Sequence, residues 1–342
     1  MKREAGEKGL VMRKLLWACG ILALLWCAFW AAGTYAVRAG VMQGVAQGLR
    51  DGTLYAPPVV AMAGFPARFD LRVQGIDAGD PRSGIRWQTP FLQVQAALWR
   101  PWHVVALLDD DHVLTLPDQQ LSLAADDMRA SITVTPDSTL TLTQFAVTLT
   151  QPVLVSSQGW RSAGDIAEAH VNLRPSPANS YAIVLAATNI VADPAFAVAT
   201  GLDGTIARIT LDGTATFSAP LDRMAGQTQP QVTDITLTNT QVAWGDVQMT
   251  ATGTITADVN GFAAGRIDIA ITGWRSLVTA LVGTGTITPQ AAPTVEGLLG
   301  AMAAQGGNPD VLALPLIFAN GRGTFGPLPL GAAPRMRQMA VN

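Results

Sequence analysis

Among the side chains that could do chemistry in this sequence, His112 has the most suggestive surroundings. It directly follows the acidic run Asp109–Asp111, and carboxylates beside an imidazole can bind a metal cation. Apolar residues before and after the run predict two strands paired with each other, Val104–Leu108 and Val113–Leu116, so we interpret the run as a solvated turn. No EF-hand loop and no HExxH helix is present. The sequence therefore predicts no metal site.

Nucleophile and phosphate-binding motifs are also missing. There is no G-x-S-x-G elbow, and both cysteines, Cys19 and Cys27, lie in one apolar stretch near the N-terminus. Gly321, Gly323 and Gly326 have G-x-G-x-x-G spacing, but they belong to a predicted strand hairpin and the Pro-rich tail after it, and not to a strand-to-helix turn. We therefore predict no catalytic residue, no cofactor and no enzymatic activity.

Large aromatic side chains form the remaining candidate binding set. On a sheet face left uncovered they would line an apolar groove, and on a covered face they would pack an ordinary core. The candidate groove residues are Trp87, Trp99, Trp102, Trp244 and Trp274.

The part of the chain that positions these side chains follows an uncharged stretch, which runs from Leu15 to Val37. As a helix the stretch would rise about 34 Å, enough to cross a hydrocarbon layer of about 30 Å. Five Lys or Arg precede it, against only Arg38 and Arg50 just after it. By the positive-inside rule, residues 1–14 are then cytoplasmic, residues 15–37 span the membrane, and everything after residue 38 lies outside.

A cleaved signal peptide is the competing interpretation. Ala31-Ala32-Gly33 is an acceptable cleavage site, but the apolar run continues past it. Apolar residues every four positions to Leu49 predict that the helix extends through residues 38–53 as a linker, ending at Asp51-Gly52. We therefore predict an uncleaved anchor.

The part beyond the anchor is acidic and contains no cysteine. The whole chain has a net charge of −3, and no lysine follows Lys14. The arginines are scattered, so no basic stripe is available for a phosphate backbone. Nucleic-acid binding is excluded on this ground.

Residues 54–342 show the alternation of apolar residues with threonine that is typical of half-buried strands. We predict a mainly β fold: a long curved antiparallel sheet, open or groove-like, after the N-terminal transmembrane helix. The alternation changes phase at Gln144, which predicts a bulge there. Apolar spacing predicts short helices from Trp274 to Leu281 and after Pro293.

Several motifs together resemble a bacterial family, the domain of unknown function 2125 family. The motifs are Gly64-Phe65-Pro66-Ala67-Arg68-Phe69, Trp87-Gln88-Thr89-Pro90-Phe91-Leu92, Val242-Ala243-Trp244-Gly245 and Gly273-Trp274-Arg275. The resemblance implies a membrane-anchored protein of the Gram-negative envelope and brings no catalytic residues. The Gly64-Phe65-Pro66 motif after an anchor is also similar to the start of AsmA-like, lipid-handling envelope proteins.

Two hypotheses for function follow. The first is an inner-membrane-anchored periplasmic protein that binds or transfers lipid or another apolar ligand in envelope maintenance. The alternative is a non-catalytic scaffold that binds other envelope proteins through sheet edges or loops.

Overall fold

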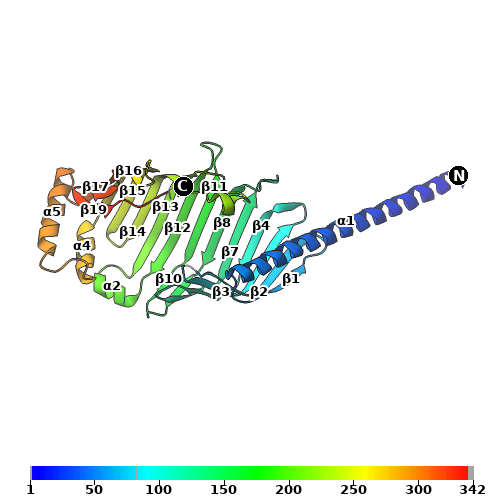
Figure 1. The fold of residues 1–342 in the computed structure, drawn as a ribbon, viewed down its shortest axis with the longest axis horizontal. Coiled ribbons are helices and arrows are strands. Elements are labelled where there is room, and N and C mark those ends of the chain that lie inside the picture. Colours follow the sequence, from blue (N-terminus) through cyan, green and yellow to red (C-terminus); the bar gives the residue numbers. More distant parts are fainter. Residues whose placement is uncertain (1, 82, 338–342) are drawn as a thin grey trace.

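The protein is a long helix joined to one large sheet (Figure 1). The computed structural model describes residues 2–81 and 83–337, so residue 1 of the predicted cytoplasmic segment, and residues 82 and 338–342 of the predicted β-rich body, lie outside it. Helix α1 (Lys2–Asp51) is unbroken through the predicted span and linker. It ends where the sequence predicts, because Gly52 has a φ of 71° and the amides of Thr53 and Leu54 both donate to the Gly48 carbonyl.

From Trp17 onward, α1 is long and apolar enough to cross a membrane. The side chains from Trp17 to Phe29 are all exposed, and the N-terminal part of the helix projects away from the sheet (Figure 1). From Trp30 onward one side of the helix is partly buried. The second half of α1 is therefore the part that packs on the body.

The described residues form nineteen strands in one sheet, and every pairing is antiparallel. The strands are β1 (Val59–Ala63), β2 (Arg68–Asp80), β3 (Ile85–Ala97), β4 (Arg100–Leu108), β5 (His112–Thr115), β6 (Gln120–Ala124), β7 (Asp127–Val134), β8 (Leu142–Thr150), β9 (Val153–Ser156), β10 (Arg161–Ala163), β11 (Ile166–Leu173), β12 (Ser180–Val191), β13 (Thr205–Phe217), β14 (Val232–Trp244), β15 (Val247–Ala257), β16 (Ala263–Thr272), β17 (Val311–Ala319), β18 (Arg322–Phe325) and β19 (Leu328–Ala332). The predicted fold class, mainly β with a long antiparallel sheet after an N-terminal helix, is confirmed.

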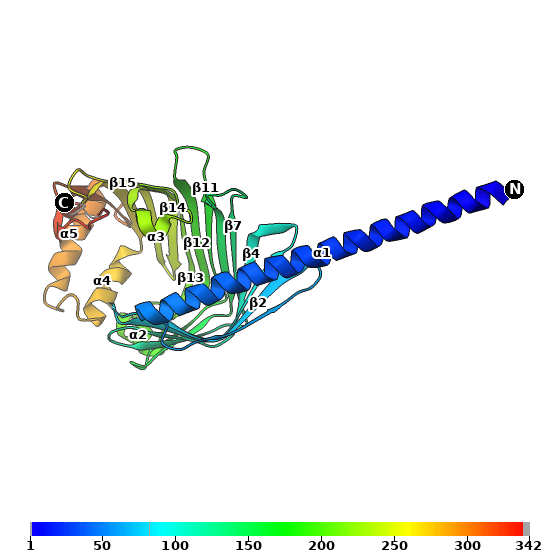
Figure 2. The same cartoon turned by 45° about the vertical axis from the view of Figure 1, so that its right-hand side comes forward.

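The sheet is curved, as Figure 2 shows: β2 and β3 turn beneath α1, while β7 to β15 rise behind it. Four neighbouring long strands are each broken once, which divides them into the pairs β4 and β5, β6 and β7, β8 and β9, and β10 and β11. We call this line of breaks the crease; it consists of residues 109–111, 125–126, 151–152 and 164–165.

The crease corrects one prediction. β4 and β5 do not pair with each other; they lie end to end along β3, with Leu92 opposite Leu108 and Gln88 opposite Val113. The acidic run Asp109–Asp111 is the break between them, and the Asp109 amide still donates to Phe91 on β3. A polar run between two apolar segments suggests a hairpin turn, but here it separates two strands that pair with the same neighbour, β3.

Two bulges adjust the faces of the strands. Thr133 pairs with Gln144 and Val134 with Leu142, so Thr143 is the extra residue and the bulge predicted at Gln144 is confirmed. In β14 a second bulge lies between Leu237 and Thr240. Because of it, these two residues face the same side although they are three positions apart.

Of the four other helices, three lie at the end of the sheet far from α1, and the short third one lies in the connection between β13 and β14, near the start of β8 (Figure 2). The four are α2 (Pro194–Thr200), α3 (Ala225–Thr228), α4 (Trp274–Gly283) and α5 (Ala292–Gln305), of which α4 and α5 match the two predicted helices. The main buried cluster lies where α4 and α5 meet β15, β16 and β17, and Trp274, which is 2% exposed, is its largest member. The best-packed core is therefore at this end.

Candidate functional site

One face of the sheet is apolar along its whole length. Residues directly opposite each other in neighbouring strands share a face, so the register defines rows that cross the sheet. The first row is Val60, Val73, Leu92, Leu108, Met128, Leu149, Ala167, Ala187, Ile209, Val242, Met249, Ile271 and Leu312.

Two parallel rows extend this surface. The second is Met62, Leu71, Val94, Ala106, Ala130, Val147, Ala169, Leu185, Leu211, Thr240, Ala251, Ile269 and Leu314. The third runs from Phe69 through Ala96, Val104, Ile132, Phe145, Val171, Ile183, Gly213, Leu237, Gly253, Ile267 and Leu316 to Phe325. We call the three rows the apolar face; Thr240 is the one polar member.

The opposite face is mixed and largely polar. Along the strands that carry Leu149, Ile209 and Met249, the next residues are Thr148, Thr210 and Thr250. Because successive side chains point to opposite sides of a strand, these threonines face away from the apolar rows. Adjacent positions therefore provide matched probes of the two faces.

Both ends of the apolar face are covered and its middle is open. At one end, α1 packs so closely that a Cβ on Gly33 would lie 2.6 Å from the Phe69 ring. At the other end, Trp274 of α4 packs on the cluster that contains Leu312 and Leu314. Between them, Ile132 is 43% and Leu185 is 41% exposed. This exposed apolar middle of the sheet is the candidate site.

The crease forms a pocket in this face. The pocket has a volume of about 350 Å³ and is lined by Trp87, Leu108, His112, Leu114, Leu121, Leu123, Met128, Val147, Leu149 and Leu154. These residues come from strands on both sides of the crease. A smaller hollow of about 190 Å³ shares Leu123 and Leu154 with the pocket, so apolar lining continues along the crease.

The ring nitrogens of Trp87 and His112, both in the pocket lining, all have hydrogen-bond partners within the protein. The Trp87 indole Nε1 lies 3.2 Å from His112 Nδ1 and donates to it, and His112 Nε2 lies 2.9 Å from the Asp109 carbonyl. Since Nδ1 accepts a hydrogen bond, Nε2 carries the ring proton and donates it to the Asp109 carbonyl. Both ring nitrogens are used, so His112 presents no free polar atom to a ligand.

The structure does not bring the five predicted groove tryptophans together. Trp87 lines the crease pocket, and Trp99 and Trp102 lie at the turn between β3 and β4 and on β4. Trp244, at the end of β14, donates to the Asp203 carbonyl and stacks on Phe196 of α2. It also packs against the buried cluster that contains Trp274, so these two tryptophans share one core.

Sequence reasoning missed the aliphatic lining of the pocket, chiefly Leu121, Leu123 and Leu154. Their short alternation with serine or valine was visible, but only the register shows which residues face Met128 and Leu149. The motif residues Gly64, Phe65 and Pro66 form the turn between β1 and β2.

The other histidines lie apart from the pocket. His103 Nδ1 is 2.8 Å from Thr133 Oγ1, and His170 Nε2 is 3.4 Å from Glu168. Among the described residues, no three His, Cys, Asp or Glu side chains are placed to hold a metal ion.

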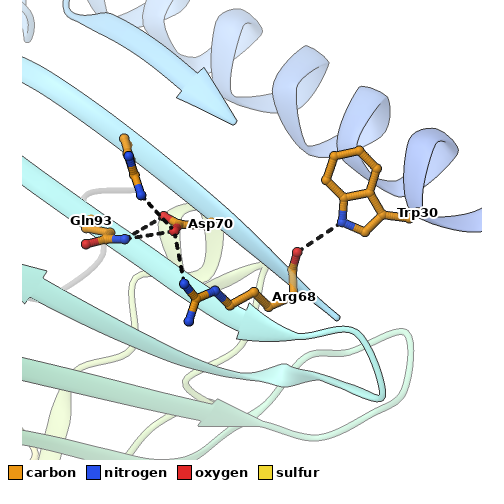
Figure 3. Close-up of polar contacts among 5 residues, drawn as sticks. Trp30, Arg68, Asp70 and Gln93 are labelled. Atoms are coloured by element: carbon orange, nitrogen blue, oxygen red, sulfur yellow. Dashed lines mark hydrogen bonds and ion pairs between the residues drawn. The ribbon is translucent and has the colours of Figure 1, made fainter. Parts of the chain in front are cut away.

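A buried charge organises the strands next to α1 (Figure 3). Asp70 is 1% exposed, accepts two hydrogen bonds of 2.8 Å from Gln93 Nε2, and lies 3.4 Å from Arg72 and 3.8 Å from Arg68. The Arg68 carbonyl in turn accepts a 3.0 Å hydrogen bond from the Trp30 indole on α1. The helix and strands β2 and β3 are thus joined through one polar cluster.

These features define a class: a single-sheet β protein that carries one open apolar face and begins with a helix suited to crossing a membrane. Within it, the chain belongs to the DUF2125 family, described as an uncharacterized protein conserved in bacteria, whose model matches residues 29–334. No curated protein and no solved structure matches the chain.

Proposed function

We propose that this protein is an inner-membrane-anchored, non-catalytic protein whose periplasmic sheet binds or transfers the acyl chains of lipids in envelope maintenance. The observation that carries the proposal is the crease pocket, which is lined by aliphatic side chains and two aromatic rings whose polar atoms are already paired. Such a lining suits a ligand segment that makes no hydrogen bonds.

The size of the surface suits a long chain. A volume of about 350 Å³ falls in the range of small-ligand sites. The first row crosses thirteen strands, which at about 4.8 Å per strand is roughly 60 Å along the sheet. Burying about ten methylene groups contributes about 8 kcal/mol, enough for stable binding without a polar contact.

The contacts of α1 support an uncleaved anchor. The Trp26 and Trp30 indoles donate to the carbonyls of Pro66 and Arg68, at 2.8 and 3.0 Å. Cleavage after Ala31-Ala32-Gly33 would remove both donors from the mature protein. The basic residues before Leu15 favour a cytoplasmic N-terminus and a periplasmic body. Intact-mass measurement of the purified protein tests the anchor, and a mass that lacks the first 33 residues would refute it.

Photocrosslinking in intact cells tests lipid binding. A photoreactive amino acid replaces Leu149, on the apolar face, or Thr148, the adjacent residue on the opposite face. We expect lipid adducts, identified by mass spectrometry, at position 149 and far fewer at position 148. Equal yields at the two positions, or no lipid adduct at position 149, would contradict the proposal.

A scaffold for envelope proteins is the second candidate. Strand β19 lies at the edge of the sheet and is exposed throughout, so its unpaired backbone groups are available to another chain. The same photoreactive residue placed at Leu330 would then give protein adducts. Protein adducts there, together with no lipid at position 149, favour the scaffold.

A further inference from the structure

The turn between β1 and β2 lies beside a part of α1 that belongs to the predicted membrane span. Trp26 and Trp30 bind the carbonyls of Pro66 and Arg68 across this contact, and the rings of Trp30 and Phe65 meet edge to face with centroids 5.3 Å apart. The body is therefore fastened to the helix at residues 26–30, well before the span ends at Val37.

The depth of this contact follows from the charges that bound the span. Lys14 sets the inner boundary, and Trp30, sixteen residues later, is about 24 Å along the helix. With a hydrocarbon layer of about 30 Å, the Trp30 backbone is then about 6 Å inside the outer boundary. Measured back from Arg38 instead, it is about 12 Å inside. By either measure, the turn bound to Trp30 reaches the outer leaflet.

The chemistry of the turn fits this position. Phe65 is 56% exposed although it is a large aromatic residue, and residues 64–67 carry no charge. The neighbouring turn between β3 and β4 adds Trp99, 68% exposed, and the two turns are joined by a 3.0 Å hydrogen bond from the Leu98 amide to the Ala67 carbonyl. We call these two turns the tip.

Cations follow both aromatic residues. Arg68 and Arg100 are exposed and begin β2 and β4, immediately behind the tip. Aromatic rings at the boundary of the hydrocarbon, with arginines behind them at the level of the phosphates, are the arrangement found where proteins enter one leaflet. The two kinds of side chain therefore point to the same partner, a phospholipid leaflet.

We infer that the tip, with Phe65 and Trp99 at its end, inserts into the outer leaflet of the membrane that holds α1. The inference rests on the proposed uncleaved anchor. It adds a second attachment of the body to the membrane and places the ends of β2, β3 and β4, where the apolar face begins, in contact with the acyl chains of that leaflet.

Spin-label depth measurements on the full chain test this. The chain is reconstituted in vesicles of phosphatidylethanolamine and phosphatidylglycerol, with one labelled cysteine at a time: native Cys19 in a Cys27→Ser background, or Phe65→Cys, Trp99→Cys or Val259→Cys in a background without native cysteines. Val259 is the matched control, because it is apolar and 87% exposed but lies in the turn between β15 and β16.

We expect labels at residues 19, 65 and 99 to collide more with oxygen than with a water-soluble nickel complex, and the label at residue 259 to show the reverse. A label at residue 19 in the hydrocarbon, with residues 65 and 99 both in water, overturns the inference and leaves the anchor intact. A label at residue 19 in water overturns the anchor as well. Two positions in the tip are labelled separately, so that a change in the turn caused by one substitution does not decide the result.

Discussion

Replacing Thr240 with valine should stabilise the protein. Thr240 lies in the second row of the apolar face, opposite Leu211 and Ala251. Its hydroxyl oxygen is buried and has no hydrogen-bond partner among the described residues. The bulge in β14 is what turns this side chain toward the apolar face. Valine has nearly the same shape, so Thr240→Val removes the unpaired hydroxyl without a new cavity.

The expected gain follows from two contributions. A buried hydroxyl without a partner costs about 1–3 kcal/mol, and a buried methyl group in its place contributes up to about 0.8 kcal/mol. Allowing for partial relaxation around the side chain, we expect a gain of about 1–2 kcal/mol in the free energy of unfolding. With a urea slope of about 3 kcal/mol/M, the midpoint should rise by about 0.3–0.7 M.

Equilibrium urea unfolding of the full chain in lipid nanodiscs, followed by far-ultraviolet circular dichroism, measures this. Thr250→Val is the matched control, since Thr250 is exposed on the opposite face of the neighbouring strand, and its effect should stay within about 0.5 kcal/mol. A midpoint that falls or does not move in Thr240→Val, with the control unchanged, would refute the reasoning, because the hydroxyl would then have a partner that offsets its burial.

Three further predictions concern the two ends of the sheet and one turn. Gly33→Leu should detach α1 from Phe69 and raise hydrogen exchange in β1, whereas Gly40→Leu, where a Cβ meets no atom within 4 Å, should not; equal exchange in the two variants would contradict the packing. Trp274→Ala should lower the free energy of unfolding by about 3–5 kcal/mol, because it empties the core, and a loss below about 1 kcal/mol in urea unfolding would argue against that role. Hydrogen bonds from the Thr139 side chain and backbone lower the pKa of Asp137. Its carboxylate therefore stabilises the turn between β7 and β8 at pH values above the ordinary pKa of aspartate. This stability should be lost as the pH falls through the lowered pKa, and Asp137→Asn should abolish the pH dependence of amide exchange in the turn, corrected for intrinsic rates.

The parts of the fold that sequence predicts here are those set by local patterns. The end of α1 at Gly52, the bulge beside Gln144 and the helix that follows Pro293 each depend on neighbouring residues alone, and each is found in the structure. Alternation also shows which residues of one strand share a side. It does not show which strand, at which register, lies opposite.

The crease and its pocket depend on that missing register. The break at Gln151 involves a φ of 51° and hydrogen bonds to Asp165, an arrangement with no signature in composition. The five tryptophans were grouped by size and type, but the pocket is built mainly from leucines such as Leu121 and Leu154, which only the pairing of β5, β6 and β9 brings beside Trp87. Common aliphatic residues do not mark a site until the fold places them.

The order of strands has a consequence for biosynthesis. Most strands pair with the strand that precedes them in the chain, and the exceptions are short nested hairpins around the crease. The most extensive contacts of such a sheet join strands that follow one another in the chain, which favours assembly strand by strand. Because the chain is made from its N-terminus, a nascent polypeptide can add each strand to the edge begun by β1 and β2 while the rest is still being synthesised. Helices α4 and α5 and then strands β17 to β19 are made last, so the order of synthesis is also the order in which the sheet is built.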